Sequence, residues 1–134
     1  MRLNQVTVPC VDYAASVAFY KTLGLIQIVD SPPRYARFEC PAGDGGEPAT
    51  FSLHHVDGWQ GADDPLVYFE VDNRDAEYAR LEAAGLDFIS APEDQTWAWR
   101  EAFLRDPAGN RICLYQAGPN RRFPPWRLKD APAQ

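Results

Sequence analysis

The sequence has no apolar run approaching the roughly 20 residues that cross a bilayer, so we expect no transmembrane segment and no membrane partner. Its first ten residues, MRLNQVTVPC, carry neither a long apolar stretch nor a cleavage site. We therefore expect no signal peptide and a cytoplasmic protein.

Cysteine, histidine and positive charge are also scarce. The three cysteines, Cys10, Cys40 and Cys113, form no Cys-x-x-Cys pair, which argues against a zinc knuckle or a dithiol redox site. The only histidines are the adjacent His54 and His55. With 13 Lys and Arg against 19 Asp and Glu, the net charge of −6 argues against nucleic acid as a partner.

The chain does contain an internal repeat. Two helical stretches, residues 11–28 and 72–89, begin at the caps Asp12 and Asn73 and end at Gly24 and Gly85. These glycines are separated by 61 positions, from 24 to 85. The same offset relates six further pairs, which are Val6 and Val67, Ala15 and Ala76, Ala18 and Ala79, Leu25 and Leu86, Ile28 and Ile89, and Leu53 and Leu114. One constant offset along the chain indicates a duplication.

Each copy predicts a strand, a helix and three further strands, which makes the protein α+β with tandem βαβββ repeats. The first module, residues 1–57, has strands near 3–9, 25–30, 34–40 and 49–56. The second, residues 61–116, has strands near 65–71, 86–90, 97–105 and 110–116. Turn-forming residues mark hairpin loops at 41–48 and 106–110. A chain of 134 residues is long enough for one domain with a hydrophobic core, and the two modules are expected to form it over residues 1–116.

Alternation along the strands assigns their two faces. Aliphatic and aromatic residues such as Val67, Phe69, Ile112 and Leu114 are expected to pack under the helices. The intervening positions form a polar and aromatic set. We therefore predict a curved, cup-like mixed sheet, with helices on the outside and a ligand on the open face.

Three stretches carry a resemblance to a known family: LNQVTVPCVDYAASVAFYKTLGL, VYFEVDNRDAEYARLEAAGL and REAFLRDPAGNRICLYQ. Through them the chain resembles the vicinal oxygen chelate superfamily, which includes glyoxalase I, extradiol dioxygenases, methylmalonyl-CoA epimerase, and the bleomycin- and fosfomycin-resistance proteins. The Asp-Pro-x-Gly-Asn turn is the most distinctive piece. The resemblance implies an eight-stranded cup and, for small members, a homodimer with cups near the subunit interface.

In the metalloenzymes of this superfamily, side chains of the first and last strands of each module hold a divalent cation, usually through His or Glu. The resemblance carries these positions to Gln5, Ser52, Leu66 and Cys113. An amide, a hydroxyl, an alkyl group and a thiol do not make a hard octahedral site. We predict no metal and no other cofactor. The alternative is a divalent metal at a displaced site that includes His54.

The open face supplies the candidate ligand-binding residues, which are Gln5, Thr7, Arg37, Ser52, His54, Leu66, Tyr68, Arg111, Cys113 and Tyr115. Candidate catalytic residues are His54 as a general base, Cys113 as a nucleophile, and Glu70. Structural roles are the alternative, in which His54 is a polar residue that lines the cup and Cys113 is a small, buried, unreactive residue at its floor. The charged residues could then pair as Arg37–Glu39 and Arg111–Glu70. Trp97 and Trp99 are expected to face a helix or a partner chain.

The proline-rich tail, residues 117–134, is expected to dock Phe123 and Trp126 on the body or on a partner subunit, with residues after Lys129 fraying. Three functions stay open. We favour a protein that binds a small organic molecule without the standard metal site, as in the bleomycin-resistance group. The alternatives are a glyoxalase-type lyase or isomerase, or dioxygenase-like enzyme, with a non-standard site, and a non-catalytic scaffold.

Overall fold

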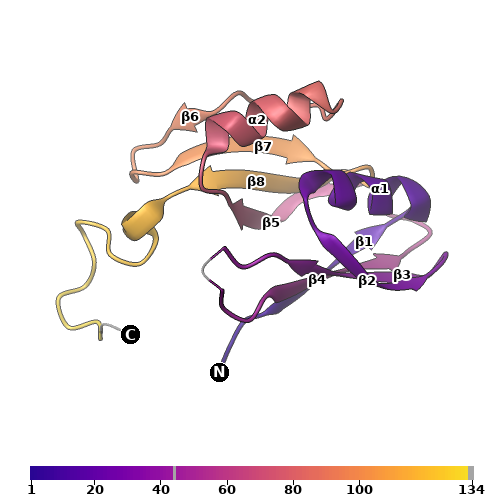
Figure 1. The fold of residues 1–134 in the computed structure, drawn as a ribbon, viewed down its shortest axis with the longest axis horizontal. Helices are drawn as coiled ribbons and strands as arrows, with labels where there is room; N and C mark the ends of the chain where they lie inside the picture. Colours follow the sequence, from indigo (N-terminus) through magenta and orange to yellow (C-terminus); the bar gives the residue numbers. More distant parts are fainter. Residues whose placement is uncertain (44, 133–134) are drawn as a thin grey trace.

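The computed structural model describes residues 1–43 and 45–132, which form two four-stranded mixed sheets (Figure 1). The first module contains β1 (Gln5–Cys10), α1 (Tyr13–Leu23), β2 (Ile26–Ser31), β3 (Tyr35–Cys40) and β4 (Ala49–His55), in the sheet order β1-β4-β3-β2. The second contains β5 (Ala62–Glu70), α2 (Arg74–Ala83), β6 (Glu93–Asp94), β7 (Arg100–Arg105) and β8 (Asn110–Gln116), in the order β5-β8-β7-β6. These are sheets A and B below. The tandem βαβββ prediction is confirmed.

Both helices begin where cap chemistry predicts, and α1 ends at its predicted glycine, whereas the C-terminal cap of α2 is Ala84, one residue before Gly85. The side chain of Asp12 accepts a hydrogen bond from the backbone N–H of Ala15, and Asn73 accepts one from Ala76. Gly24 ends α1 in the left-handed conformation, with φ of 114°. Neither α1 nor α2, within the described residues, is long and apolar enough to cross a membrane.

One continuous core joins the two modules through their helix-bearing faces. It includes the predicted Ile112 and Leu114 of sheet B together with Phe51 and Leu53 of sheet A. The rings of Phe51 and Phe69, from the two modules, lie 5.6 Å apart between centroids. Burial of this shared apolar surface therefore stabilises both modules at once.

The Asp-Pro-x-Gly-Asn turn is a buried junction between the modules. Asp106 accepts hydrogen bonds from the backbone N–H groups of Ala108 and Asn110, which shape the turn. Its second oxygen accepts from the Tyr20 hydroxyl of α1 at 2.7 Å and from the Asn110 side chain at 2.8 Å. Asn110 also donates to the carbonyl oxygen of Pro9 in β1. The motif thus has a structural role that reaches across the molecule.

The second strand predicted for the second module, residues 86–90, is wrong. Among the described residues only a single bridge, between Phe88 and Leu104, forms there, and the edge of sheet B is the two-residue β6. The backbone N–H groups of Ile89 and Ser90 both donate to the carbonyl oxygen of Phe103, which breaks the alternating ladder. Pro92 follows and has no N–H to continue it.

The strand predicted at 97–105 begins only at Arg100. Residues 96–98 form a tight turn, in which the Ala98 N–H donates to the carbonyl oxygen of Gln95 and Ala98 has a φ of 65°. The prediction that Trp99 faces a helix is also wrong, whereas contact of Trp97 or Trp99 with a partner chain stays a prediction. The Trp99 ring stacks on Tyr115 of the same chain, on the open face of sheet B.

The tail leaves sheet B after β8 through a short 3-10 helix, Gly118–Arg121, and extends away from the two sheets (Figure 1). Trp126 lines a cavity of about 170 Å³ together with Trp97 and Trp99. Phe123 lies under the guanidinium groups of Arg122 and Arg127 and is exposed, so its docking on a partner subunit stays a prediction. Asp44, within the predicted loop 41–48, and residues 133–134 of the predicted fraying end lie outside the described residues.

Candidate functional site

The open face of sheet A carries a polar network across three strands. Pairing of β3 with β4 sets Tyr35 opposite His54 and Arg37 opposite Ser52, while β1 contributes Gln5. The amide nitrogen of Gln5 donates to Ser52 Oγ at 2.7 Å, and Ser52 Oγ lies 2.8 Å from the Tyr35 hydroxyl. Arg37 Nε donates to the same hydroxyl at 2.8 Å. The predicted residues Gln5, Arg37 and Ser52 therefore meet around Tyr35.

The surroundings of Tyr35 change the acidity of its hydroxyl. Partial burial acts to raise its pKa, but the hydrogen bonds with Ser52 and Arg37, together with the positive charge of Arg37, outweigh burial. The net result is a pKa below the ordinary value for tyrosine. The network therefore stabilises negative charge on this oxygen.

The other two predicted residues of sheet A lie beside this network. Thr7 is opposite Ser52 in the pairing of β1 with β4, and its hydroxyl lies 3.4 Å from the Gln5 amide nitrogen. His54 is exposed and sits opposite both Tyr35 and Pro9. His55 points to the other side, where its Nδ1 lies 3.9 Å from an Asp57 carboxylate oxygen.

The open face of sheet B is aromatic. The rings of Trp99 and Tyr115 stack at a centroid distance of 4.8 Å, and Tyr68 meets each of them edge-on at 5.9 and 5.5 Å. Tyr115 is buried beneath, whereas 43% of Tyr68 is exposed. Leu66 and Phe103 pack against this cluster. We call Tyr68, Trp99 and Tyr115 the aromatic face.

Cys113 forms the floor of the aromatic face and is fully buried. Burial of the thiol, reinforced by the negative charge of Glu101, raises the pKa of Cys113 to about 12. A backbone hydrogen bond from Ala102 and the charge of Arg111, whose guanidinium lies 4.5 Å from the centroid of the Phe103 ring, oppose this shift without cancelling it. At neutral pH the thiol is protonated, and a protonated thiol is a poor nucleophile and a poor metal ligand.

The predicted pairings of charged residues on the open faces are wrong. Glu70 lies 3.6 Å from Arg121 of the tail, not beside Arg111. Arg37 engages the Tyr35 hydroxyl instead of Glu39. The tail thus contributes a charge to the rim of sheet B, which the strand pattern alone did not indicate.

A groove of about 300 Å³ runs where the first strands of the two modules approach each other. It is lined by Gln5 and Thr50 from sheet A and by Tyr68 and Glu70 from sheet B. Among the described residues, no hydrogen bond or ring contact joins His54 to Cys113 or Glu70, the other two candidate catalytic residues. The edges of the two open faces meet at this groove.

The four positions that hold the metal in related enzymes do not fit a divalent cation here. Gln5 and Ser52 are hydrogen bonded to each other, Leu66 has no donor atom, and the thiol of Cys113 is protonated. Nor do three or more His, Cys, Asp or Glu side chains gather into a potential metal site anywhere in residues 1–43 and 45–132. A hard cation requires several oxygen or imidazole donors, which this set does not supply.

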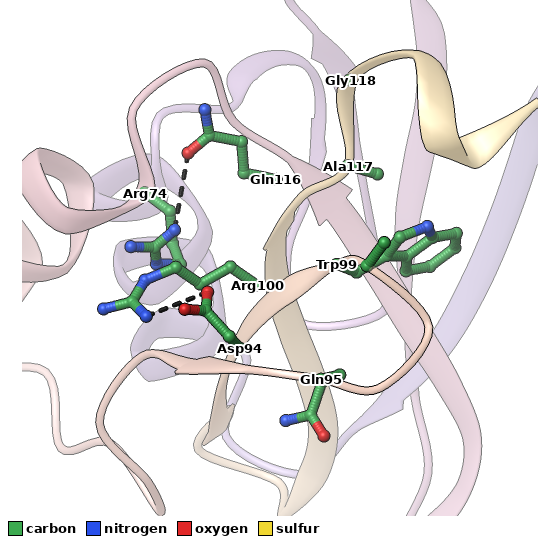
Figure 2. Close-up of a pocket in the computed structure, with 9 residues that line it drawn as sticks. Arg74, Asp94, Gln95, Trp99, Arg100, Gln116, Ala117 and Gly118 are labelled. Atoms are coloured by element: carbon green, nitrogen blue, oxygen red, sulfur yellow. Dashed lines mark hydrogen bonds and ion pairs between the residues drawn. The ribbon is translucent and has the colours of Figure 1, made fainter. Parts of the chain in front are cut away.

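A second cavity, of about 380 Å³, opens beside the first turn of α2 (Figure 2). Arg74 is almost fully buried there and donates to Gln116 at 3.4 Å and to Asp75. Arg100 lies 3.0 Å from Asp94 and 3.5 Å from Asp75. Two arginines facing two aspartates leave no net charge. We interpret this group as ion pairs that tie α2 to the edge of sheet B.

Sequence reasoning missed three residues of the open faces. Tyr35 lies two positions before Arg37, so alternation could have placed it on the same face. Glu101 is 2% exposed and accepts a hydrogen bond from Trp97 Nε1 at 2.8 Å, at the side of the aromatic face. Pairing with Tyr115 across β7 and β8 places Glu101 on this face, whereas the position of Trp99 depends on the turn at 96–98, for which the sequence pattern gave no clear signal.

Comparisons with known proteins agree with this architecture. The profile of the Glyoxalase/Bleomycin resistance protein/Dioxygenase superfamily matches residues 2–114. The chain is 32% identical over 120 residues to the anthracycline biosynthesis protein DnrV of Streptomyces peucetius, a match that covers 80% of this chain and 44% of that protein. The chain therefore spans less than half the length of this curated relative.

Several solved structures have the same fold as this chain. The bleomycin resistance determinant encoded on transposon Tn5 superposes with a TM-score of 0.70 at 21% identity, covering 88% of this chain and 99% of that one. A bleomycin-binding protein complexed with bleomycin gives 0.68 at 22%, covering 87% and 98%. Lactoylglutathione lyase from Agrobacterium tumefaciens gives 0.68 at 20%, covering 86% and 92%. At these identities the likeness shows the fold alone.

Proposed function

We propose a ligand-binding function from the premise that the chain belongs to the Glyoxalase/Bleomycin resistance protein/Dioxygenase superfamily. The protein binds a small, planar aromatic molecule on its open faces, and it does so without a divalent metal. The fold itself is compatible with several chemistries, so the proposal depends on the residues of those faces.

The aromatic face is the observation that carries this proposal. Tyr68 presents a partly exposed ring beside Trp99, over the buried ring of Tyr115. A planar ligand that stacks here gains apolar burial and, for each favourable ring pair, about 0.5–1.5 kcal/mol beyond it. Ring systems held by neighbouring rings lose little conformational entropy on binding.

The names of two similar proteins support a small organic ligand, and one of them supports a planar aromatic one. The relative with 32% identity is named for anthracycline biosynthesis, and anthracyclines are built on planar fused rings. A protein with the same fold was solved in complex with bleomycin. Both names concern other proteins, so they indicate a ligand class to test here.

The metal-free part of the proposal follows from the donor set. Ser52 is bonded to Gln5 and Tyr35, and the amide oxygen of Gln5 accepts a hydrogen bond from Thr50, so both side chains are engaged in a protein network. The pKa of Cys113, raised to about 12, keeps its thiol neutral. Hydrogen bonding and ring stacking remain as the means of holding a ligand.

An enzyme using His54, Cys113 or Glu70 is the weaker alternative. The protonated thiol of Cys113 is a poor nucleophile. His54 belongs to sheet A and Glu70 to sheet B, where Glu70 faces Arg121. An acid–base pair requires groups within reach of one substrate atom, and these two side chains do not supply that arrangement within one chain.

We also propose that the protein is a homodimer with its cups near the interface. Strands β1 and β5 each lie at an edge of their sheet, and the groove between them is lined in part by the half-buried Val6 and Val67. Unpaired strand edges beside apolar side chains favour association. Light scattering coupled to size exclusion should give twice the 15.1 kDa of one chain; a monomer at micromolar concentration would contradict this assignment.

A fluorescence titration with anthraquinone-2-sulfonate tests the binding function. Stacking against Trp99 should quench tryptophan emission to saturation. Trp99→Ala should weaken binding about tenfold through lost stacking and burial, whereas Phe123→Ala, in the tail, should leave the affinity unchanged. Circular dichroism confirms that both variants fold. The proposal fails if the wild type shows no saturable quenching, or if Trp99→Ala binds as tightly as the wild type.

A further inference from the structure

The polar network on sheet A has a defined hydrogen-bond direction. Gln5 donates through its amide nitrogen to Ser52 Oγ, and Arg37 donates through Nε to the Tyr35 hydroxyl oxygen. Only the contact of 2.8 Å between Ser52 and Tyr35 is ambiguous, because either hydroxyl could donate. The burial of Ser52 resolves it.

Ser52 is fully buried, and the partners of its hydroxyl among the described residues are Gln5 and Tyr35. A serine hydroxyl has one hydrogen to donate. If Tyr35 donated to Ser52, the serine hydrogen would remain buried without an acceptor, which is costly. Ser52 therefore donates to Tyr35.

Tyr35 then accepts two hydrogen bonds, from Ser52 and from Arg37, and neither uses its own hydrogen. The Tyr35 side chain is only partly buried, on the open face of sheet A. We propose that the Tyr35 hydroxyl donates this hydrogen to a carbonyl oxygen of the bound ligand. The inference rests on the proposed function and adds that the planar ligand is a ketone or a quinone.

A carbonyl oxygen fits because the network offers it a donor and no free acceptor. The Tyr35 oxygen is already occupied by two donors, so a ligand hydroxyl would find no strong acceptor there. Two donors to the same oxygen also polarise the O–H bond and strengthen the hydrogen bond it makes. The network thus places a hydrogen-bond donor beside Gln5 and Ser52, where related metalloenzymes use a cation.

The contacts link this donor to the aromatic face. Tyr35 contacts Ser52, Ser52 contacts Gln5, and Gln5 lines the groove whose other wall includes Tyr68. A planar ligand stacked at Tyr68 and extending across the groove would bring the oxygen of a ring carbonyl group to the polar network. The aromatic face would then bind the rings of the ligand, and the polar network would bind its carbonyl oxygen.

A matched pair of probes tests the proposal. Anthraquinone-2-sulfonate and anthracene-2-sulfonate share the planar rings and the sulfonate, so attraction to Arg37 and stacking cancel, and the ring carbonyls remain as the main difference. Tyr35→Phe should weaken anthraquinone-2-sulfonate binding about 3- to 10-fold and anthracene-2-sulfonate binding less than about 2-fold. Tyr78→Phe, on α2 outside the open faces, is the control and should change neither affinity.

Other outcomes overturn the proposal. If Tyr35→Phe weakens the binding of both probes equally, the hydroxyl affects the shape of the site and does not bind the carbonyl oxygen. If it changes neither affinity, the hydroxyl makes no hydrogen bond to the carbonyl oxygen. If neither probe binds the wild type, the proposed function fails. Neutron diffraction of the unliganded protein then decides the donor direction separately: deuterium on Tyr35 pointing away from Ser52 supports it, and deuterium pointing at Ser52 overturns it.

Discussion

Replacing Tyr20 with phenylalanine removes the hydrogen bond that joins α1 of the first module to the Asp-Pro-x-Gly-Asn turn of the second. The Tyr20 side chain is fully buried, and its hydroxyl donates to Asp106 at 2.7 Å. A buried hydrogen bond to a charged acceptor contributes about 1.5–3 kcal/mol. In this variant the Asp106 carboxylate still accepts hydrogen bonds from Ala108 and Asn110, so the buried charge keeps other partners.

We therefore expect Tyr20→Phe to lower the free energy of unfolding by about 2 kcal/mol, which corresponds to roughly 6–10 °C in Tm for a domain of this size. Asp106→Ala should cost more, about 3–5 kcal/mol, because it leaves several buried donors without an acceptor. Urea denaturation measures both losses, with the m-value as the check that unfolding stays two-state.

A double-mutant cycle gives the decisive result. Once Asp106 is alanine, the Tyr20 hydroxyl has lost its acceptor, so Tyr20→Phe should then cost less than about 0.5 kcal/mol. Tyr13→Phe is the matched control, because the Tyr13 hydroxyl bonds to Asp30 on the first module and does not reach Asp106. If Tyr20→Phe lowers the free energy of unfolding equally in the wild type and in Asp106→Ala, the hydrogen bond between Tyr20 and Asp106 does not contribute to stability, which would refute the junction.

Three further predictions follow from burial and backbone geometry. With a pKa of about 12, Cys113 should resist iodoacetamide at pH 8 in the folded protein, and peptide mass spectrometry showing rapid alkylation there would contradict its neutral, buried state. Gly61→Ala should destabilise by about 1–3 kcal/mol, because its Cβ would lie 2.8 Å from the Gly109 carbonyl oxygen, whereas Gly58→Ala, in open space, should not; equal urea midpoints would contradict this. Burial and the Asp30 hydrogen bond raise the pKa of Tyr13 to about 12, so its contribution is present below pH 10, the unfolded value, and is lost as the pH rises towards 12. Urea midpoints should therefore fall over this range less steeply in Tyr13→Phe, and identical pH profiles would contradict the shift.

Local sequence signals predicted most of the fold because they coincide with the tertiary structure. The caps Asp12 and Asn73 bind the backbone N–H groups expected of them, and alternation placed Ile112 and Leu114 in the core. The prediction of a strand at residues 86–90, at the edge of sheet B, was wrong for a physical reason. The backbone N–H groups of Ile89 and Ser90 both donate to the carbonyl oxygen of Phe103, and Pro92 has no N–H to donate. These two features prevent a regular ladder of hydrogen bonds, so they override the strand propensity of the segment.

The open faces were predicted less completely than the core. Parity along a strand is enough to place Ser52 and Arg37 on one face, and it could equally have placed Tyr35 there. The position of Trp99 depends on a turn with a positive φ at Ala98, a conformation that alanine rarely adopts and that no local pattern signals. The partner of Glu70 comes from the tail, and contacts between distant segments are not encoded in local periodicity.

The most direct test of the account is calorimetric titration of anthraquinone-2-sulfonate into protein dialysed against EDTA, repeated with Mg²⁺, Mn²⁺, Ni²⁺ or Zn²⁺ added. The donor set of Gln5, Ser52, Leu66 and Cys113 predicts the same dissociation constant, within about twofold, in every condition. Binding that appears only when one of these cations is present, taken up in a stoichiometric amount, would contradict the account.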